Sequence, residues 1–317
     1  MRIISFAASR LAGLAVTLLI TSFIVYGALY IAPGNPIATL TGGRPLPQRT
    51  IAAIQAEYGL DQPFLLRYVH WLGNVLKGNF GQSIVFRENV STLIAARAST
   101  TTFLVAYAAL LIILFGVVLG AISALRKGPA DTAILASTTI GIATPSFVAA
   151  ILMISVFTLG LHWFPAIGAG SGFADRLWHL TMPAAALALA GTAYVARLTR
   201  AAANEELQRE HVDTARSRGI PEALVVKRHV LRNAMIPVTT VAGLTVAGLI
   251  AGSVVVENAF AVNGLGSYLV TSVEQKDFGV VQAITLLLVA AFVLVNTAVD
   301  MLYALIDPRV RVAGAGR

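Results

Sequence analysis

TTFLVAYAALLIILFGVVLGAISAL, which occupies residues 101–125, contains no charged side chain. A helix needs about 20 predominantly apolar residues to cross the hydrocarbon core of a bilayer, and this stretch is longer than that. The whole chain has the same character, because AVILMFWYC residues make up 57% of its 317 residues and Asp, Glu, Lys and Arg only 12%. So few charges could not cover the surface of a water-soluble fold of this size. The sequence therefore predicts an all-α protein embedded in lipid.

The apolar stretches predict six transmembrane helices, over residues 11–32, 101–125, 132–161, 180–198, 236–256 and 280–306. The third is longer than a span requires and contains Thr144-Pro145, where we expect a tilt or a kink. The fourth is expected to open at Met182-Pro183, since proline suits the first helical turn. The first follows two arginines, as a signal peptide would, but it is too long and lacks a cleavage site. We interpret it as a retained anchor.

Lysine and arginine distribution predicts the orientation of these spans. Fifteen basic residues fall in the termini and in the second-to-third and fourth-to-fifth connections, and eight fall on the opposite side. Cytoplasmic segments carry the excess, so both termini are expected in the cytoplasm. The net charge of +8 is read as this asymmetry and not as a nucleic-acid surface. The predicted parts are residues 1–32, a small helical outer segment at 33–99, a five-helix core at 100–306 with an inner loop at 200–233, and a tail at 307–317.

The inner loop has its own local structure. Residues 210–237 read EHVDTARSRGIPEALVVKRHVLRNAMIP. A helix is expected up to Arg218, with Gly219 in the left-handed conformation that ends it. Pro221 is preset for the first turn of a second helix. A surface loop does not need this much order, so the helix–turn–helix is interpreted as a surface for a cytoplasmic partner.

The loop resembles the coupling loop of ABC importer permeases. Asp213-Thr214-Ala215 stands where that family has Glu-Ala-Ala, and Gly219 occupies its glycine position. The similarity covers nearly the whole chain, through PGNP at 33–36, YGLDQP at 58–63, GNFGQS at 78–83, ENAF at 257–260, GLG at 264–266 and DMLYALIDPR at 300–309. Asn263 departs from the proline common in the family. The chain resembles the first permease subunit of dipeptide, oligopeptide and nickel importers, a type I ABC importer permease.

The resemblance implies a mechanism and partners. The loop would dock in a cytoplasmic ATPase subunit and transmit its closure to the spans through Asp213, Thr214, Ala215, Arg216, Gly219, Ile220 and Pro221. The expected partners are a second permease, two ABC ATPase subunits or one fused pair, and an extracytoplasmic substrate-binding protein. ATP and Mg would bind to the ATPases. The substrate is expected to be a di- or oligopeptide, with a nickel chelate or glutathione as the alternative. The location would be the plasma membrane of a prokaryote.

Five polar residues are candidates for a pathway or gate: Glu257, Asn258, Asp277, Asn296 and Asp300. The last two are four apart on the sixth span and share one face, where packing is favoured over a pathway role. The other three lie in or beside an acidic outer loop, which in the resembled family dips toward the pathway.

Other chemistry is not indicated. The chain has no G-x-x-x-x-G-K-[ST], no H-E-x-x-H and no G-x-S-x-G. Its five histidines are scattered in sequence and it has no cysteine, so we expect neither a catalytic residue nor a metal site. An ion-coupled transporter would need ionisable groups at mid-membrane and two matched halves, and neither is clear. A membrane anchor with a signalling or nucleic-acid-binding loop is the third alternative. Gly116 and Gly120 predict close helix packing, as do Gly243, Gly248 and Gly252.

Overall fold

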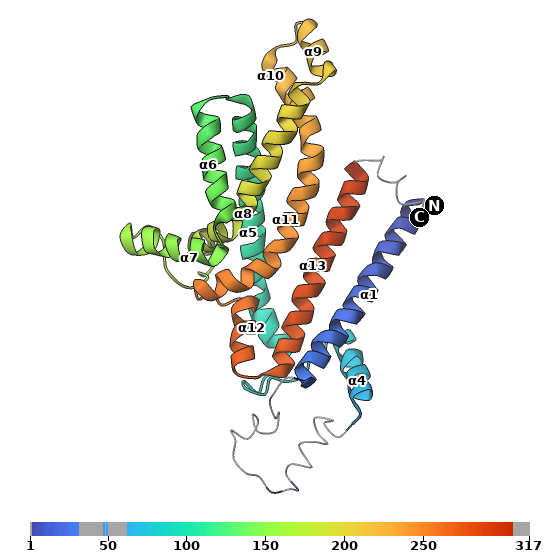
Figure 1. Ribbon diagram of the computed structural model, residues 1–317. Coiled ribbons are helices and arrows are strands. Elements are labelled where there is room, and N and C mark those ends of the chain that lie inside the picture. The colour runs from blue at the N-terminus through green and yellow to red at the C-terminus, as the bar shows by residue number, and fades with distance from the viewer. Residues whose placement is uncertain (1, 32–46, 48, 50–61, 307–317) are drawn as a thin grey trace. The chain divides into compact units, whose positions relative to one another are not determined.

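The computed structural model describes residues 2–31, 47, 49 and 62–306, and their regular structure is helical (Figure 1). Within these residues the only β feature is an isolated bridge between Gln82 and Asn89. The predicted turns at 33–47, the YGLDQP motif up to Asp61 and the tail at 307–317 lie outside the described residues. Contacts divide the chain into two units, Met1–Thr101 with Asn263–Ala291, and Thr102–Val262 with Phe292–Arg317.

The first unit consists of α1 (Arg2–Ile31), α4 (Phe64–Leu76), α12 (Leu265–Glu274) and the first parts of α5 (Val90–Leu125) and α13 (Phe278–Ile306). Its buried core is apolar and consists of Val90, Leu93, Ile94, Leu265, Tyr268, Val280, Ala283 and Ile284. The hydroxyl of Thr101 accepts a hydrogen bond from the amide of Leu265, at 2.8 Å. This bond ties the start of α12 to α5.

The second unit contains the rest of α5 and α13 together with eight further elements. These are α6 (Pro129–Ala143), α7 (Ser146–Met153), the π-helix η1 (Ile154–Gly160), α8 (Phe173–Leu207), α9 (Glu210–Ser217), α10 (Glu222–Val225), the π-helix η2 (Val226–Leu231) and α11 (Arg232–Ala259). In Figure 1, α9 and α10 lie together beyond the ends of α8 and α11. The predicted helix–turn–helix therefore extends away from the spans of its own unit.

Helix α8 is the centre of the second unit. It packs against α6, α7 and α11, and much of its length is buried. Small side chains permit this packing: a Cβ on Gly116 would lie 2.8 Å from the side chain of Val195, and one on Gly120 would lie 2.4 Å from the carbonyl oxygen of Ala196. The predicted close approach at these two glycines is confirmed. A Cβ on Gly248, by contrast, would meet nothing within 4 Å.

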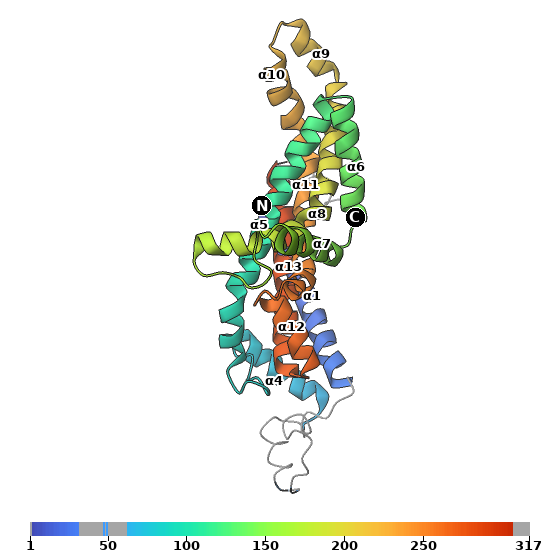
Figure 2. The same ribbon diagram turned by 90° about the vertical axis from the view of Figure 1, so that its left-hand side faces the viewer.

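The predicted third span is broken at Thr144-Pro145. Helix α6 ends at Ala143, Thr144 is extended at φ −88° and ψ 115°, and α7 begins after Pro145. Proline disfavours the helical conformation of the residue before it, which explains the break. The two halves are bent by 109°, so α7 and η1 turn across the direction of α6 (Figure 2). Among the described residues, five helices are long and apolar enough to cross a membrane, and six if this bent pair is one span.

Several helices extend beyond their predicted ends. Helix α5 begins at Val90, and α8 begins at Phe173 after Gly172, with Asp175 in its first turn. Hydropathy marks only the part of a helix that suits lipid, so polar helical ends escape it. The prediction that Pro183 opens the fourth span is wrong, because Pro183 is buried inside α8. Tertiary packing holds α8 together there although proline leaves one helical hydrogen bond unmade.

Candidate functional site

The first arm of the inner loop ends at Gly219. The φ angle of this glycine is +73°, the left-handed conformation that the sequence predicts. Its amide donates to the carbonyl of Arg216 at 2.9 Å, and the amide of Ile220 donates to the carbonyl of Ala215 at 3.3 Å. This pair of bonds is the Schellman motif, which satisfies carbonyls at the end of α9. A Cβ at Gly219 would meet nothing within 4 Å, so conformation and not space selects glycine here.

The second arm begins at Pro221 and runs without interruption into the membrane. Pro221 caps α10, and its carbonyl accepts hydrogen bonds from the amides of Leu224 and Val225 at 2.8 and 3.0 Å. The sequence predicts Pro221 in the first turn of the second helix, whereas in the structure it lies one residue before that turn. Helix α10 continues through η2 into α11 with helical backbone at each junction. Helical backbone therefore joins the loop to α11 without a break.

The inner face of the loop is an apolar anchor. Val212 and Ala215 of α9 lie three residues apart on one face and are buried, as are Val225 and Val230 of the second arm. All four belong to the core of the second unit. Ala215 thus faces the interior of the loop, where its small side chain lets the two arms approach.

The outer face of the loop is polar. Asp213, Thr214, Arg216, Gly219 and Pro221 are exposed, and Ile220 is half-buried. Arg216 connects the two arms, because its Nη2 and Nε lie 2.7 and 3.1 Å from the carboxylate oxygens of Glu222. This hydrogen bond raises the pKa of Arg216 above its ordinary value. Its Nη1 also lies 3.7 Å from Asp213. The structure brings these predicted coupling residues together on a single turn.

A cluster at the base of the loop was not predicted. Glu206 at the end of α8 is nearly buried, and its Oε1 lies 3.0 Å from Nε of Arg209. Its Oε2 has no hydrogen-bond partner among the described residues and lies 3.6 Å from Nε2 of His211. The rings of His211 and His229 are 6.2 Å apart, centroid to centroid. These two histidines are scattered in sequence, and only the pairing of the two arms brings them together.

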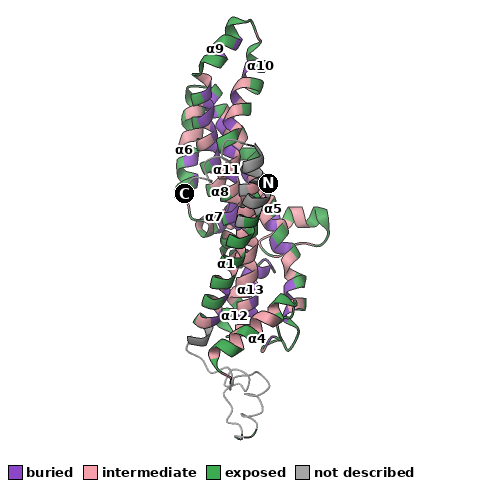
Figure 3. Ribbon diagram, turned by 90° about the vertical axis from the view of Figure 1, so that its right-hand side faces the viewer, coloured by how far each residue is buried: buried purple, intermediate pink, exposed green. Residues whose placement is uncertain are grey.

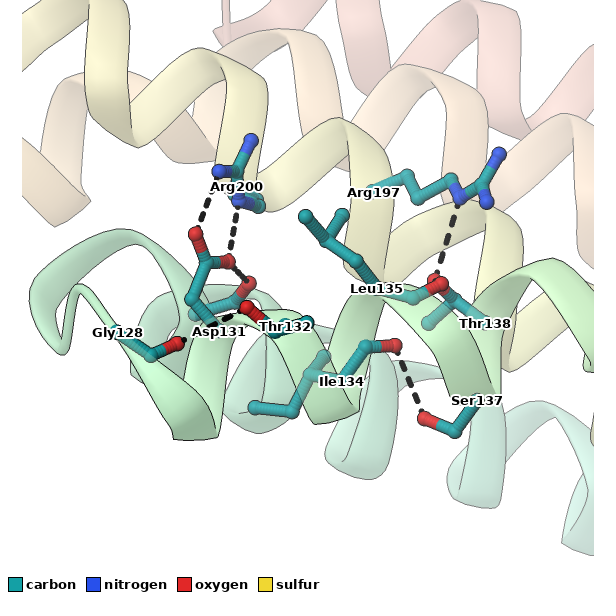
Figure 4. Close-up of polar contacts among 10 residues, drawn as sticks. Gly128, Asp131, Thr132, Ile134, Leu135, Ser137, Thr138, Arg197 and Arg200 are labelled. Atoms are coloured by element: carbon teal, nitrogen blue, oxygen red, sulfur yellow. Dashed lines mark hydrogen bonds and ion pairs between the residues drawn. The ribbon is translucent and has the colours of Figure 1, made fainter.

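An ion pair supports the helix that leads to the loop. Arg200 of α8 donates two hydrogen bonds to Asp131 in the first turn of α6, both at 2.7 Å. Ser123 also donates to Asp131, and Arg197 donates to Thr138 at 3.2 Å (Figure 4). A bidentate arginine–carboxylate pair fixes orientation as well as distance. The sequence offered one signal for it, an acidic residue beside a span, where such residues are rare.

The candidate gate residues occupy different surroundings. Glu257 is buried near the end of α11, and Asn258 beside it is exposed. Asn296 is half-buried on α13, and its Oδ1 has no hydrogen-bond partner in the described part of the chain. The side chain of Asp300 lies outside the described residues.

Asp277 is buried at the start of α13 and holds a loop of the first unit. It accepts hydrogen bonds from the hydroxyl of Ser83 and from the amides of Ile84 and Val85, both at 3.4 Å. The amide of Val280 lies 3.5 Å from its Oδ1, so Asp277 also caps α13. The carboxylate therefore has a structural task, which sequence reasoning did not assign to it.

Residues 112–312 match the family described as binding-protein-dependent transport system inner membrane component, and residues 3–105 match the N-terminal family of the same description. The glutathione transport system permease protein GsiC of Pectobacterium atrosepticum is 39% identical over 303 residues, which cover 95% of this chain and 97% of that protein. GsiC of Escherichia coli strain K12 is 38% identical over 309 residues, which cover 97% of this chain and 99% of that protein.

A solved structure has a similar fold. It is titled as an inward-facing conformation of the MetNI methionine ABC transporter, and its matching chain is 17% identical. The match covers 68% of this chain and 96% of that chain, with a TM-score of 0.55.

Proposed function

The chain belongs to the family of binding-protein-dependent transport system inner membrane components, and from this premise we propose that it couples ATP hydrolysis in partner subunits to the import of glutathione or short peptides. It is a multi-pass permease subunit of an ABC importer, and it works with an ATPase and a substrate-binding protein. The proposed complex contains a second permease and two ATPase subunits, which bind the ATP and Mg. Six spans make half of the pathway, and the second permease completes it.

The proposed coupling surface is the exposed turn of α9 and α10. It presents Asp213, Thr214 and Arg216 beside Gly219. The buried side chains of Val212 and Ala215 anchor the same turn to the core. The observation that carries the proposal is the continuous helix from α10 through η2 to α11. In alternating access, closure of the ATPases would move this helix as a rigid body and shift the pathway between two packings.

Charge reversal at matched positions tests the coupling surface. Asp213→Arg is expected to abolish ATP-driven uptake and to weaken co-purification of the ATPase subunits. Glu274→Arg makes the same charge change at an exposed residue near the end of α12, and it is expected to leave co-purification intact. Equal co-purification of both variants, with equal uptake, would refute the docking role of Asp213.

Glutathione is the first substrate to test, because relatives named as glutathione permeases are 38–39% identical over nearly the whole chain. Short peptides have related chemistry and were the expectation from sequence, with nickel chelates as a further alternative. The binding protein is expected to select among them, since a permease pathway needs only to accept what is delivered to it.

Proteoliposomes of the assembled importer decide between these substrates. ATP-dependent accumulation of labelled glutathione is measured with and without an excess of dipeptide, oligopeptide or nickel chelate. Strong accumulation that none of these competitors reduces supports the glutathione assignment. In a parallel assay with labelled dipeptide, accumulation of the peptide but not of glutathione would replace it with the peptide assignment.

The five gate candidates are proposed to have different tasks. Asn258 and Glu257 lie near the end of α11 and are the best supported as entrance residues, because Asn258 is exposed and Glu257 is a buried acid on a predicted span. Asp277 is proposed to act through the loop that it holds, and Asn296 through packing against a partner helix. Asp300 is proposed only from its sequence position.

A further inference from the structure

Helix α4 has two apolar stripes and one polar stripe. Its 13 residues read FLLRYVHWLGNVL and include no acidic residue. At 100° per residue, Phe64, Tyr68, Trp71 and Val75 share one face, Leu65, Val69, Leu72 and Leu76 share the next, and Arg67, His70 and Asn74 share the third. An amphipathic helix needs only one apolar face to pack on its protein, so the second stripe requires an explanation.

The first stripe packs against α1 through aromatic rings. The Phe23 and Tyr68 rings are 5.2 Å apart, and those of Tyr26 and Trp71 are also 5.2 Å apart. The hydroxyl groups of Tyr68 and Ser22 lie 2.8 Å apart and share a hydrogen bond. These contacts join α4 firmly to one side of α1.

The contacts lie inside the membrane-spanning part of α1. Its apolar span covers Leu11–Ala28, and the partners of α4 on it are Ser22, Phe23 and Tyr26. Ser22 precedes the end of that span by six residues, which is about 9 Å along a helix that rises 1.5 Å per residue. Helix α4 therefore lies beside hydrocarbon depth and not above the bilayer.

The second stripe is exposed. Leu65, Val69 and Leu76 are 64%, 60% and 79% exposed, and none of the 13 residues of α4 is buried (Figure 3). On α1 the residues Ile20 and Ile24 are exposed as well, at 56% and 60%. Exposed apolar side chains are thus present on both of these packed helices.

We propose that α4 is an interfacial membrane helix, which lies in the leaflet where α1 ends and turns Leu65, Val69 and Leu76 toward the lipid acyl chains. Its polar stripe would face the headgroups. A basic polar face and tryptophan or tyrosine near the boundary are typical of such helices. Arg67, Trp71 and Tyr68 supply these features. Part of the outer segment is then a membrane element and not a water-exposed cap.

The absence of cysteine from the chain permits a direct test. Single variants Val69→Cys and Leu76→Cys, with Asn74→Cys as the control on the polar stripe, are labelled with a nitroxide in the importer assembled in lipid nanodiscs. Collisions with oxygen, which concentrates in lipid, are compared with collisions with a water-soluble nickel complex. ATP-driven uptake by each variant, measured in proteoliposomes, confirms that it is assembled.

The proposal expects the ratio of oxygen to nickel collisions to be several-fold higher at Val69 and Leu76 than at Asn74. Equal ratios dominated by the nickel complex would show a water-exposed cap and overturn the proposal. Low collision rates with both reagents at Val69 would show burial against another protein chain and would overturn it equally.

Discussion

At Gly219 a single backbone angle shapes the whole inner loop. With φ at +73°, the chain ends α9, closes the Schellman bonds and reverses toward Pro221 within three residues. An L-residue in this conformation costs about 1–2 kcal/mol, and Asn is among the few that tolerate it. The open space around the missing Cβ means that strain is the dominant effect of a substitution.

Gly219→Val is therefore expected to uncouple the importer, while Gly219→Asn retains most of its activity. Both variants add a side chain of similar volume, so size is controlled. The ratio of substrate transported to ATP hydrolysed in proteoliposomes is the measurement. If Gly219→Asn is as uncoupled as Gly219→Val, then the absence of a side chain at this position, and not the backbone conformation, is what the ATPase requires.

The Asp131–Arg200 pair is expected to depend on bidentate geometry and not on charge alone. Lysine preserves the charge but cannot form the fork. Arg200→Lys and Arg200→Gln are both expected to lower coupled transport and the thermal midpoint. The exchange Asp131→Arg with Arg200→Asp should recover part of the loss. A fully active Arg200→Lys variant would reduce the pair to a simple charge contact.

At the scale of elements, close packing of α5 on α8 sets the position of the loop. Helix α8 carries the loop at its end, and its neighbours are α6, α7 and α11 in addition to α5. Small residues make this possible, since van der Waals packing is the main force between helices in lipid. The connection between Leu207 and Glu210 is short, so the position of α8 restricts where α9 can lie.

Gly120→Ala is expected to destabilise the protein, because its Cβ would lie 2.4 Å from a carbonyl oxygen of α8. Overpacking of this kind costs typically about 1–3 kcal/mol. Gly248→Ala is the matched control on α11, where the added Cβ meets nothing within 4 Å. Thermal unfolding in detergent measures both. A lower midpoint for Gly248→Ala than for Gly120→Ala would contradict the described packing.

At the scale of the whole molecule, the membrane sets which surfaces meet which partners. The excess of Lys and Arg predicts a cytoplasmic inner loop, and α11 is the one predicted crossing between that loop and α12. The bent pair formed by α6 with α7 and η1 sets the number of spans among the described residues. With the pair as one crossing this number is six, and without it the number is five.

Cysteine labelling is expected to place Ser217 and Glu274 on opposite sides of the membrane. In intact cells a membrane-impermeant maleimide should label Glu274→Cys, whereas Ser217→Cys should react only after the cells are opened. Both residues are exposed in the structure, so accessibility is matched. Labelling of both from outside would overturn the predicted orientation.

Local and compositional features were available from the sequence. Apolar runs predicted the spans, Thr144-Pro145 predicted the kink, and Gly219 predicted the turn, because each depends on the chain's own solvent or backbone preferences. The motifs of the inner loop further identified the family, which the comparisons confirm.

Tertiary structure decided what depends on residues distant in the chain. It placed Pro183 inside α8, buried Ala215, paired Asp131 with Arg200 and committed Asp277 to the loop at Ser83. Such contacts join helices whose spacing no local pattern encodes. Sequence alone therefore determined a membrane permease with an ordered inner loop, and only the packing of its helices decided which polar side chains meet one another.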